Sequence, residues 1–170
     1  KVIEAAIRRA AKKPTGELTK VDYEKVTRLD FLLQNLTDVK GLEKLWQLTY
    51  LDLAANKLTD VKGLEKLTQL TTLALSGNQI TDVKGLEKLT ELTWLDLSKN
   101  KLTDVKGLEK LTQLTGLYLW HNQLTDVKGL EKLDQLTGLG LNDNPDLTKA
   151  QITELQKALP KCKISSNPTK

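Results

Sequence analysis

Leucine positions recur along most of this chain with a period of 22 residues. A polar-rich octapeptide, DVKGLEKL, begins at Asp38, Asp60, Asp82, Asp104 and Asp126. Between its copies runs a second phrase of the form LxxLxLxxN, which starts at Leu48, Leu70, Leu92, Leu114 and Leu136, with a degenerate copy at Val26. A fixed period of this length is typical of arrays in which each unit contacts mainly its neighbours. The pattern therefore predicts a stack of repeats.

Each LxxLxLxxN phrase predicts one short strand. Leu51 and Leu53 are two residues apart, so they share one face of an extended strand. Tyr50, Asp52 and Ala54 share the opposite face. A single strand cannot bury its leucines, but stacked strands line a continuous core. The asparagine that ends each phrase is polar in an apolar register, so we expect its amide to bond backbone groups of neighbouring repeats. These residues are Asn56, Asn78, Asn100, Asn122 and Asn144.

The repeats resemble the leucine-rich-repeat family over about residues 26–144. The 22-residue unit, with Asp-Val-x-x-Leu-x-x-Leu after the asparagine, is most similar to the internalin-type bacterial subclass. The resemblance implies an α/β fold: a right-handed solenoid arc with a concave parallel β-sheet and a convex side of 3₁₀ turns and loops. The first copy has Gln34 in place of the asparagine, so we expect an irregular end there.

Helical caps are expected at both ends of one single domain. Apolar residues at helical spacing predict a helix that starts near Val2 and is broken at Pro14. Thr19 and Thr148 each stand three residues before a side chain that completes a capping box, which predicts two further helices. Such caps shield the open ends of a repeat core. We expect caps at residues 1–25 and 146–170 and repeats at residues 26–145.

The composition disfavours catalysis. Among 170 residues there is one His and one Cys, and only 4% are aromatic. Imidazole and thiol groups carry much catalytic and metal chemistry, so we expect no enzyme activity, no cofactor and no metal site. His121 could be combined with Ser98 and an acid into a Ser-His-Asp arrangement, but no nucleophile motif supports this. We interpret His121 as an exposed contact residue beside Trp120, and Cys162 as a small buried hydrophobe.

The charge pattern also limits the classes of partner that we expect. The chain carries 26 Lys and Arg against 22 Asp and Glu, a net charge of +4. DVKGLEKL places lysine and glutamate columns side by side, which favours a solvated, compensated surface over a nucleic-acid-binding one. No apolar run approaches the roughly 20 residues that cross a bilayer, and no targeting segment is evident. We expect a soluble protein without nucleic-acid or membrane partners, and the compartment stays unassigned.

Variation is concentrated at strand positions that face away from the core. Trp94, Tyr118 and Trp120 fall on adjacent strands about 4.8 Å apart, so their rings can cluster. Small residues around them are expected to leave room for a partner's backbone: Ala74, Gly116, Gly138 and Gly140. Exposed aromatics on a rigid scaffold are typical of protein-binding hot spots, although such rings can also simply pack on each other. We predict a protein- or peptide-binding face with anchors Trp94, Tyr118, Trp120 and His121, flanked by Tyr50, Asp52 and Asp96. The acids favour a partner that presents Arg or Lys.

An alternative interface follows from the positions after the strands, where bulky side chains at both ends of the array enclose small ones. In chain order these are Leu32 and Leu33, Ala54 and Ala55, Ser76 and Gly77, Ser98 and Lys99, and Trp120 and His121. Such a profile is self-complementary about a two-fold axis, which predicts a homodimer or larger assembly. Trp46 replaces the Thr or Asp of other repeats and is a further apolar surface residue. The uniform repeats favour an engineered or idealised protein with a designed interface, but recent natural duplication can give equal uniformity.

Overall fold

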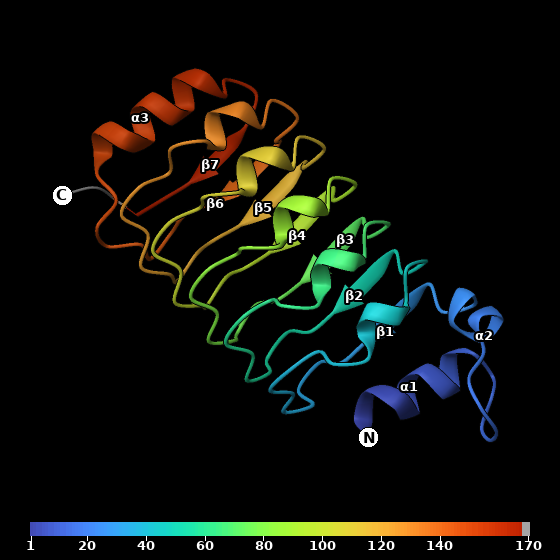
Figure 1. Cartoon of the computed structure of the whole chain (residues 1–170). Helices are drawn as coiled ribbons and strands as arrows, with labels where there is room; N and C mark the ends of the chain where they lie inside the picture. Colours follow the sequence, from blue (N-terminus) through green and yellow to red (C-terminus); the bar gives the residue numbers. More distant parts are fainter. Residues whose placement is uncertain (168–170) are drawn as a thin grey trace.

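The computed structural model describes residues 1–167 and stacks the repeats with a sheet on one side and short turns on the other (Figure 1). The strands are β1 (Arg28–Asp30), β2 (Tyr50–Asp52), β3 (Thr72–Ala74), β4 (Trp94–Asp96), β5 (Gly116–Tyr118), β6 (Gly138–Gly140) and β7 (Lys163–Ser165). All neighbours pair in parallel and in chain order. From β1 to β6 each strand residue pairs with the equivalent residue of the next repeat, so Tyr50 lies beside Thr72 and Thr72 beside Trp94. The predicted leucine-rich-repeat solenoid is confirmed.

The DVKGLEKL segment forms the side opposite the sheet. It contains a 3₁₀ turn in each repeat: η1 (Leu42–Lys44), η2 (Leu64–Lys66), η3 (Leu86–Lys88), η4 (Leu108–Lys110) and η5 (Leu130–Lys132). The residue before each turn is a glycine with a φ between 100° and 106°, a region that only glycine adopts readily. In the third of these turns, the backbone N–H of Gly85 donates to Oε2 of Glu87 at 2.5 Å. The turn geometry therefore explains why a glycine and a glutamate recur at these two positions of every repeat.

Asparagine side chains join neighbouring repeats through the core. Nδ2 of Asn100 donates to the carbonyl oxygens of Leu75 and Leu97, both at 3.0 Å. Its Oδ1 accepts from the backbone N–H of Ile80 at 3.0 Å. The same bonds recur at the other ladder asparagines, as predicted. In the first repeat, Gln34 instead donates to the nearby carbonyl of Leu32, so the ladder begins one repeat later.

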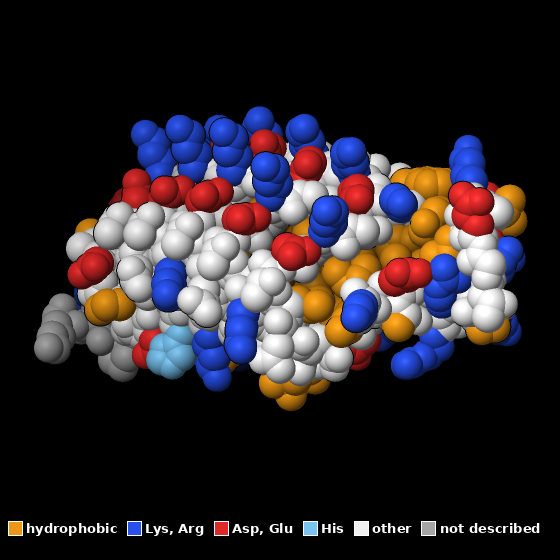
Figure 2. Space-filling model, turned by 60° about the horizontal axis from the view of Figure 1, so that its bottom comes forward, with side chains coloured by type: hydrophobic (Ala, Val, Ile, Leu, Met, Phe, Trp, Pro, Cys, Tyr) orange, Lys and Arg blue, Asp and Glu red, His pale blue; other side chains and the backbone are white. Residues whose placement is uncertain are grey.

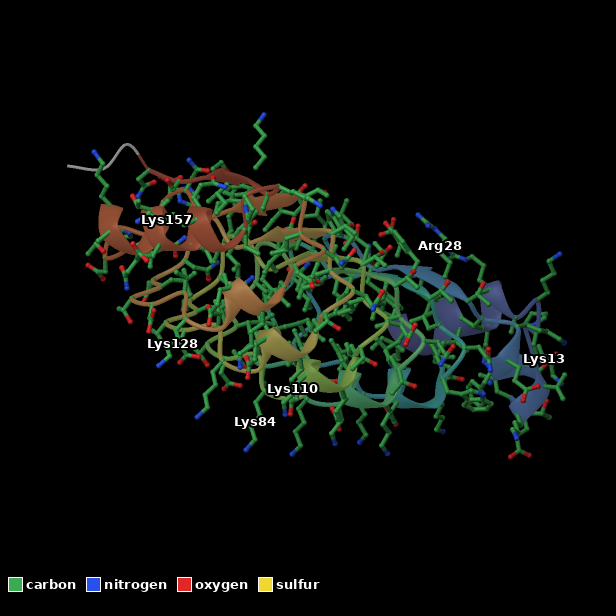
Figure 3. All side chains as sticks on the ribbon, turned by 90° about the horizontal axis from the view of Figure 1, so that it is seen from above. Lys13, Arg28, Lys84, Lys110, Lys128 and Lys157 are labelled. Carbon is green, nitrogen blue, oxygen red and sulfur yellow. The ribbon has the colours of Figure 1, made fainter. Side chains whose placement is uncertain are left out.

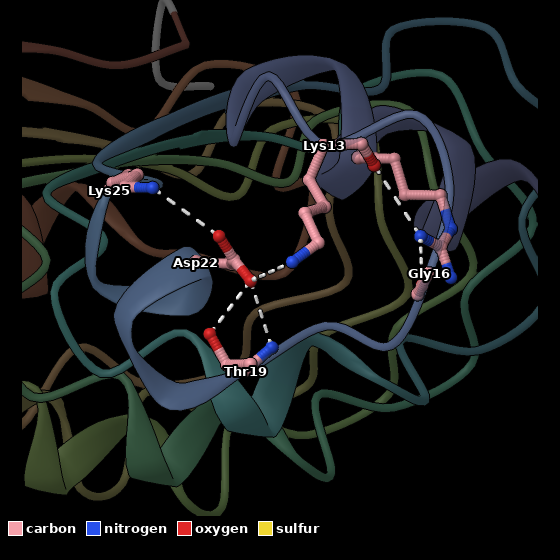
Figure 4. A network of polar contacts seen from close by, with 6 residues as sticks. Lys13, Gly16, Thr19, Asp22 and Lys25 are labelled. Atoms are coloured by element: carbon pink, nitrogen blue, oxygen red, sulfur yellow. Dashed lines mark hydrogen bonds and ion pairs between the residues drawn. The ribbon is translucent and has the colours of Figure 1, made fainter.

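The helices form where the sequence predicts them: α1 (Val2–Ala10), α2 (Lys20–Glu24) and α3 (Lys149–Ala158). Asp22 holds the N-terminal cap together (Figure 4). Its carboxylate accepts from the Thr19 backbone N–H at 3.0 Å and hydroxyl at 2.7 Å. It also lies 3.5 Å from Lys13 Nζ and 3.3 Å from Lys25 Nζ. The bond from the Thr19 backbone is the main reason that the pKa of Asp22 lies well below its usual range.

The C-terminal cap is a partial repeat. Helix α3 packs beside η5, and the chain then returns as β7, which pairs with β6. Cys162, which precedes this strand, is 4% exposed, in agreement with its expected burial. The leucine phrase does not predict β7, because this segment lacks the phrase and its alternation of apolar and polar residues spans only a few positions.

Candidate functional site

The predicted anchors gather on the solvent-facing side of the sheet, which we call the sheet face. Trp94 opens β4, Tyr118 closes β5 and Trp120 follows β5. The ring centroids of Trp94 and Tyr118 are 5.7 Å apart with the planes tilted by 50°. The rings of Trp120 and His121 are separated by 5.6 Å. We refer to Trp94, Tyr118 and Trp120 as the aromatic cluster.

The glycines beside these rings are covered by the rings themselves. A Cβ atom at Gly116 would lie 3.0 Å from Cδ1 of Trp94. One at Gly140 would lie 3.2 Å from Cδ1 of Tyr118 and 3.5 Å from Cδ1 of Trp120. The expectation that these glycines leave room for a partner's backbone is therefore wrong, because large apolar rings gain by packing onto the bare backbone. The three rings are half-buried and keep part of their surface exposed.

Each flanking aspartate uses one carboxylate oxygen to accept a hydrogen bond from the backbone. Oδ1 of Asp52 accepts from the backbone N–H of Ala54 at 2.8 Å, and Oδ1 of Asp96 accepts from that of Ser98 at 2.9 Å. Among residues 1–167, neither acid has a Lys, Arg or His nitrogen within 4.0 Å. Their negative charge is thus unpaired by the chain and available to a cationic partner group. The guanidinium of Arg28 lies 3.3 Å above the Tyr50 ring centre and stacks on it.

A column of left-handed residues runs beside the sheet face. It comprises Leu33, Ala55, Gly77, Lys99, His121 and Asp143, with φ from 53° to 68°. We call it the αL column. Only Gly77 suits this conformation without a steric cost. Lys99 Nζ lies 5.0 Å from the Trp120 ring centre, and Nδ1 of His121 is 3.2 Å from Oδ2 of Asp143. This conformation was not predicted from the sequence, because Gly77 is the one residue of the column whose type indicates it.

The other predicted contact residues lie apart from the cluster. Trp46 precedes β2 on the N-terminal side of the strands, whereas Trp120 follows β5 on their C-terminal side. Trp46 is half-buried, and Lys20 Nζ lies 5.6 Å from the centre of its ring. Leu32 and Leu33 follow β1, four repeats from Trp120, and are 46% and 67% exposed. Ala54 and Ala55 between these ends are half-buried. The structure therefore does not combine these residues into one site with the aromatic cluster.

The Ser-His-Asp arrangement does not form. The hydroxyl of Ser98 is fully buried and has no hydrogen-bond partner, whereas His121 pairs with Asp143. Within residues 1–167, no group of three or more His, Cys, Asp or Glu side chains could hold a metal ion. In the same part of the chain, no helix is long and apolar enough to span a bilayer.

The repeats match a known family model, described as Leucine Rich repeats (2 copies), at residues 46–88, 68–110 and 90–132. Together these matches span residues 46–132, more than half of the chain. A comparison with curated protein sequences finds no significant match.

The structure is similar to those of several bacterial proteins. An internalin of Listeria monocytogenes, InlF, superposes with a TM-score of 0.75 at 24% identity over 99% of this chain and 56% of its own. The functional domain of InlJ from the same species gives 0.84 at 28% identity over 98% of this chain and 36% of its own. A leucine-rich-repeat protein of Leptospira interrogans gives 0.75 at 33% identity over 85% of this chain and 38% of its own. This chain thus spans little more than half, or less, of each of these proteins.

Proposed function

Because this chain belongs to the leucine-rich-repeat family, we propose that it is a non-catalytic module that binds a protein or peptide through the sheet face and the αL column. Protein interaction is a common role of this fold. The aromatic cluster is the observation that carries the proposal. Its rings interrupt an otherwise uniform array and remain partly exposed on a rigid sheet.

The packing of the cluster supports this role. The rings of Trp94 and Tyr118 contact each other, and both rest on glycine backbone. Side chains that are already held in place lose less conformational freedom when a partner covers them. Asp52 and Asp96 add unpaired negative charge on the same face, which suits a partner with exposed Arg or Lys.

The test is a binding measurement on partners selected for the sheet face from a displayed library of random peptides. Trp120→Ala should weaken binding by about 2 kcal/mol, roughly 30-fold, because a hot-spot ring is lost. Trp46→Thr is the matched control. It removes an indole on the N-terminal side of the strands and introduces the threonine that most other repeats have at this position. Unchanged affinity in Trp120→Ala, or an equal loss in the control, contradicts the proposal.

The exposure of Leu33 favours a second candidate, a homodimer through the αL column. Leu33 combines an unfavourable φ of 58° with 67% exposure, so the fold alone gives no reason for leucine there. A two-fold axis near Gly77 would bring Leu32 and Leu33 of one copy onto Trp120 and His121 of the other. Of the residues between these ends, Ala55 and Gly77 are small, and the exposed Lys99 would face Ala55 of the other copy.

Sedimentation equilibrium at micromolar concentration tests the dimer. We expect the unmodified chain to dimerise and Leu33→Asn to be monomeric, since asparagine tolerates the left-handed region but removes the apolar contact. Sedimentation of the unmodified chain as a monomer over this range excludes the dimer and leaves the peptide-binding proposal standing.

A further inference from the structure

The turn side carries ten lysines that the sheet-face proposal does not use. They form two columns, Lys40, Lys62, Lys84, Lys106, Lys128 and Lys44, Lys66, Lys88, Lys110, Lys132, which we call the lysine rail. All ten are exposed. Figure 2 shows a row of lysines along one rim of the molecule, with a row of acids beneath it. Figure 3 shows Lys84, Lys110 and Lys128 projecting away from the ribbon.

The glutamates of this surface are bound to the backbone. Oε2 of each accepts from the N–H of the glycine two residues earlier, at 2.5–2.7 Å. Four of the five glutamates are half-buried, and only Glu131 is exposed. The pKa values of Glu65 and Glu87 are lowered chiefly by backbone N–H groups, of Glu65 and Gly63 and of Glu87 and Gly85, with smaller effects from nearby lysines. These carboxylates are therefore held close to the main chain.

The aspartates of the repeat also bond the backbone through one oxygen each, but unlike most of the glutamates all five are exposed. Oδ1 of Asp82 accepts from the backbone N–H of Lys84 at 2.9 Å, and the other four copies make the same bond. No rail lysine has Nζ within 4.0 Å of a carboxylate oxygen in residues 1–167. Only Lys44 is near an aromatic ring, 5.7 Å from the centre of Tyr23. Formal charges cancel over the face, but the lysine side chains are longer than those of the aspartates, so their ammonium groups can extend farther from the backbone.

We propose that the lysine rail binds a linear sulfated polysaccharide. Successive lysines in a column are one repeat apart on the convex side of the arc, so their spacing is at least the strand spacing of about 4.8 Å and five of them span at least about 19 Å. This length matches an extended polymer with many charges better than a single anion. Ammonium groups act as point charges without the bidentate geometry of arginine, which suits sulfates spaced along a flexible chain.

The absence of stacking groups favours a polysaccharide over single-stranded nucleic acid. Proteins that bind single strands place aromatic rings among their basic residues, because each base stacks on a ring. In the described residues, Tyr23 and Trp46 lie near the N-terminal end of the rail, and from Lys62 to Lys132 every aromatic residue lies on the sheet-face strands or directly after them.

Binding of fluorescent dextran sulfate to the full chain tests the proposal, measured by anisotropy at several salt concentrations. The triple variant Lys62→Gln, Lys84→Gln, Lys106→Gln should bind at least tenfold more weakly at low salt. The slope of log affinity against log salt should become shallower by about two to three, near one for each lysine removed. The control triple variant Lys57→Gln, Lys101→Gln, Lys161→Gln makes the same change in net charge away from the rail and should stay within threefold of the unmodified chain.

Each other outcome overturns the proposal. No binding at low salt, or equal losses in the two triple variants, shows that the rail is not a site. Equal or tighter binding of a single-stranded oligonucleotide shows that the polymer class is wrong. Matching thermal unfolding of all three chains ensures that a loss of affinity reflects the removed lysines.

Discussion

Ala55 adopts a backbone conformation that its own side chain opposes. Its φ is 53°, in the left-handed region, where a Cβ atom crowds the following carbonyl and costs roughly 1–2 kcal/mol. The corresponding residue of the next repeat is Gly77, which avoids this cost. The αL column therefore contains strain that the surrounding ladder tolerates, and its residue types are set by something other than backbone preference.

Replacing Ala55 by glycine should stabilise the protein. We expect Ala55→Gly to raise the free energy of unfolding by about 0.5–1 kcal/mol, because relief of the steric cost exceeds the entropy that glycine loses on folding. Urea denaturation followed by circular dichroism measures this change. The neighbouring substitution Ala54→Gly is the control: Ala54 has no positive φ, so it should lose about 0.5–1 kcal/mol. A loss at both sites would refute the strain argument.

Among the structural elements, the asparagine ladder is the most sensitive to substitution. We expect Asn100→Ala to lower the free energy of unfolding by about 2 kcal/mol, since it leaves the buried Ile80 N–H without a partner and removes one of the two amide donors to each of the Leu75 and Leu97 carbonyls. Asn142→Ala, which removes one bond to the Ser166 carbonyl at the half-buried end of the array, should cost less than about 1 kcal/mol. Chemical denaturation of both variants decides this; equal losses would mean that the ladder has no special role.

The N-terminal cap should respond to acid through Asp22. Because its folded pKa lies below the ordinary carboxyl value of about 4, its contribution to stability is present above that value and is lost as the pH falls below it. Asp22→Asn should therefore lower the Tm at neutral pH, with a difference that shrinks below pH 4. Thr19→Ala, which removes one donor to the carboxylate, should show a smaller effect over the same range. A Tm difference independent of pH contradicts this assignment.

At the scale of the whole molecule, the two caps keep the leucine core from water. Leu155 of α3 is 4% exposed and belongs to the core cluster. We expect Leu155→Asp to lower the Tm and cause aggregation that depends on concentration, because it detaches α3 from the last repeat. Light scattering during heating measures this. Lys157→Asp, at an exposed position on the same helix, should leave aggregation unchanged; aggregation of both variants would point to net charge instead.

Periodicity alone was enough to predict the array, its register and the asparagine ladder, because each depends on residues that recur every 22 positions. The capping boxes of α2 and α3 were also local patterns. Strand β7 was missed, because tertiary pairing with β6 decides its conformation rather than its own sequence. The packing of Trp94 on Gly116 was missed for a similar reason: the sequence placed both residues in one row, but ring orientation depends on neighbouring side chains.

The contact residues predicted on the sheet face remain a prediction. The sequence located the aromatic cluster because it departs from the repeat. It could not show that Trp46 is half-buried near Lys20, because that contact depends on how the N-terminal cap packs against the first repeats. The unusual φ of the αL column has only one local signal, Gly77, because the other residues adopt it under the constraint of the ladder.

The hydroxyl of Thr93 donates to the carbonyl of Thr71 at 3.1 Å, and the same bond joins each adjacent pair from Thr27 to Thr137. Every one of these junctions is thus joined by the same backbone connection. One more 22-residue unit inserted after Asn78 would shift Trp94 away from Tyr50 by a single strand spacing of about 4.8 Å and leave both local environments intact. The distance between two side chains on the sheet is therefore set in fixed increments by the number of repeats between them.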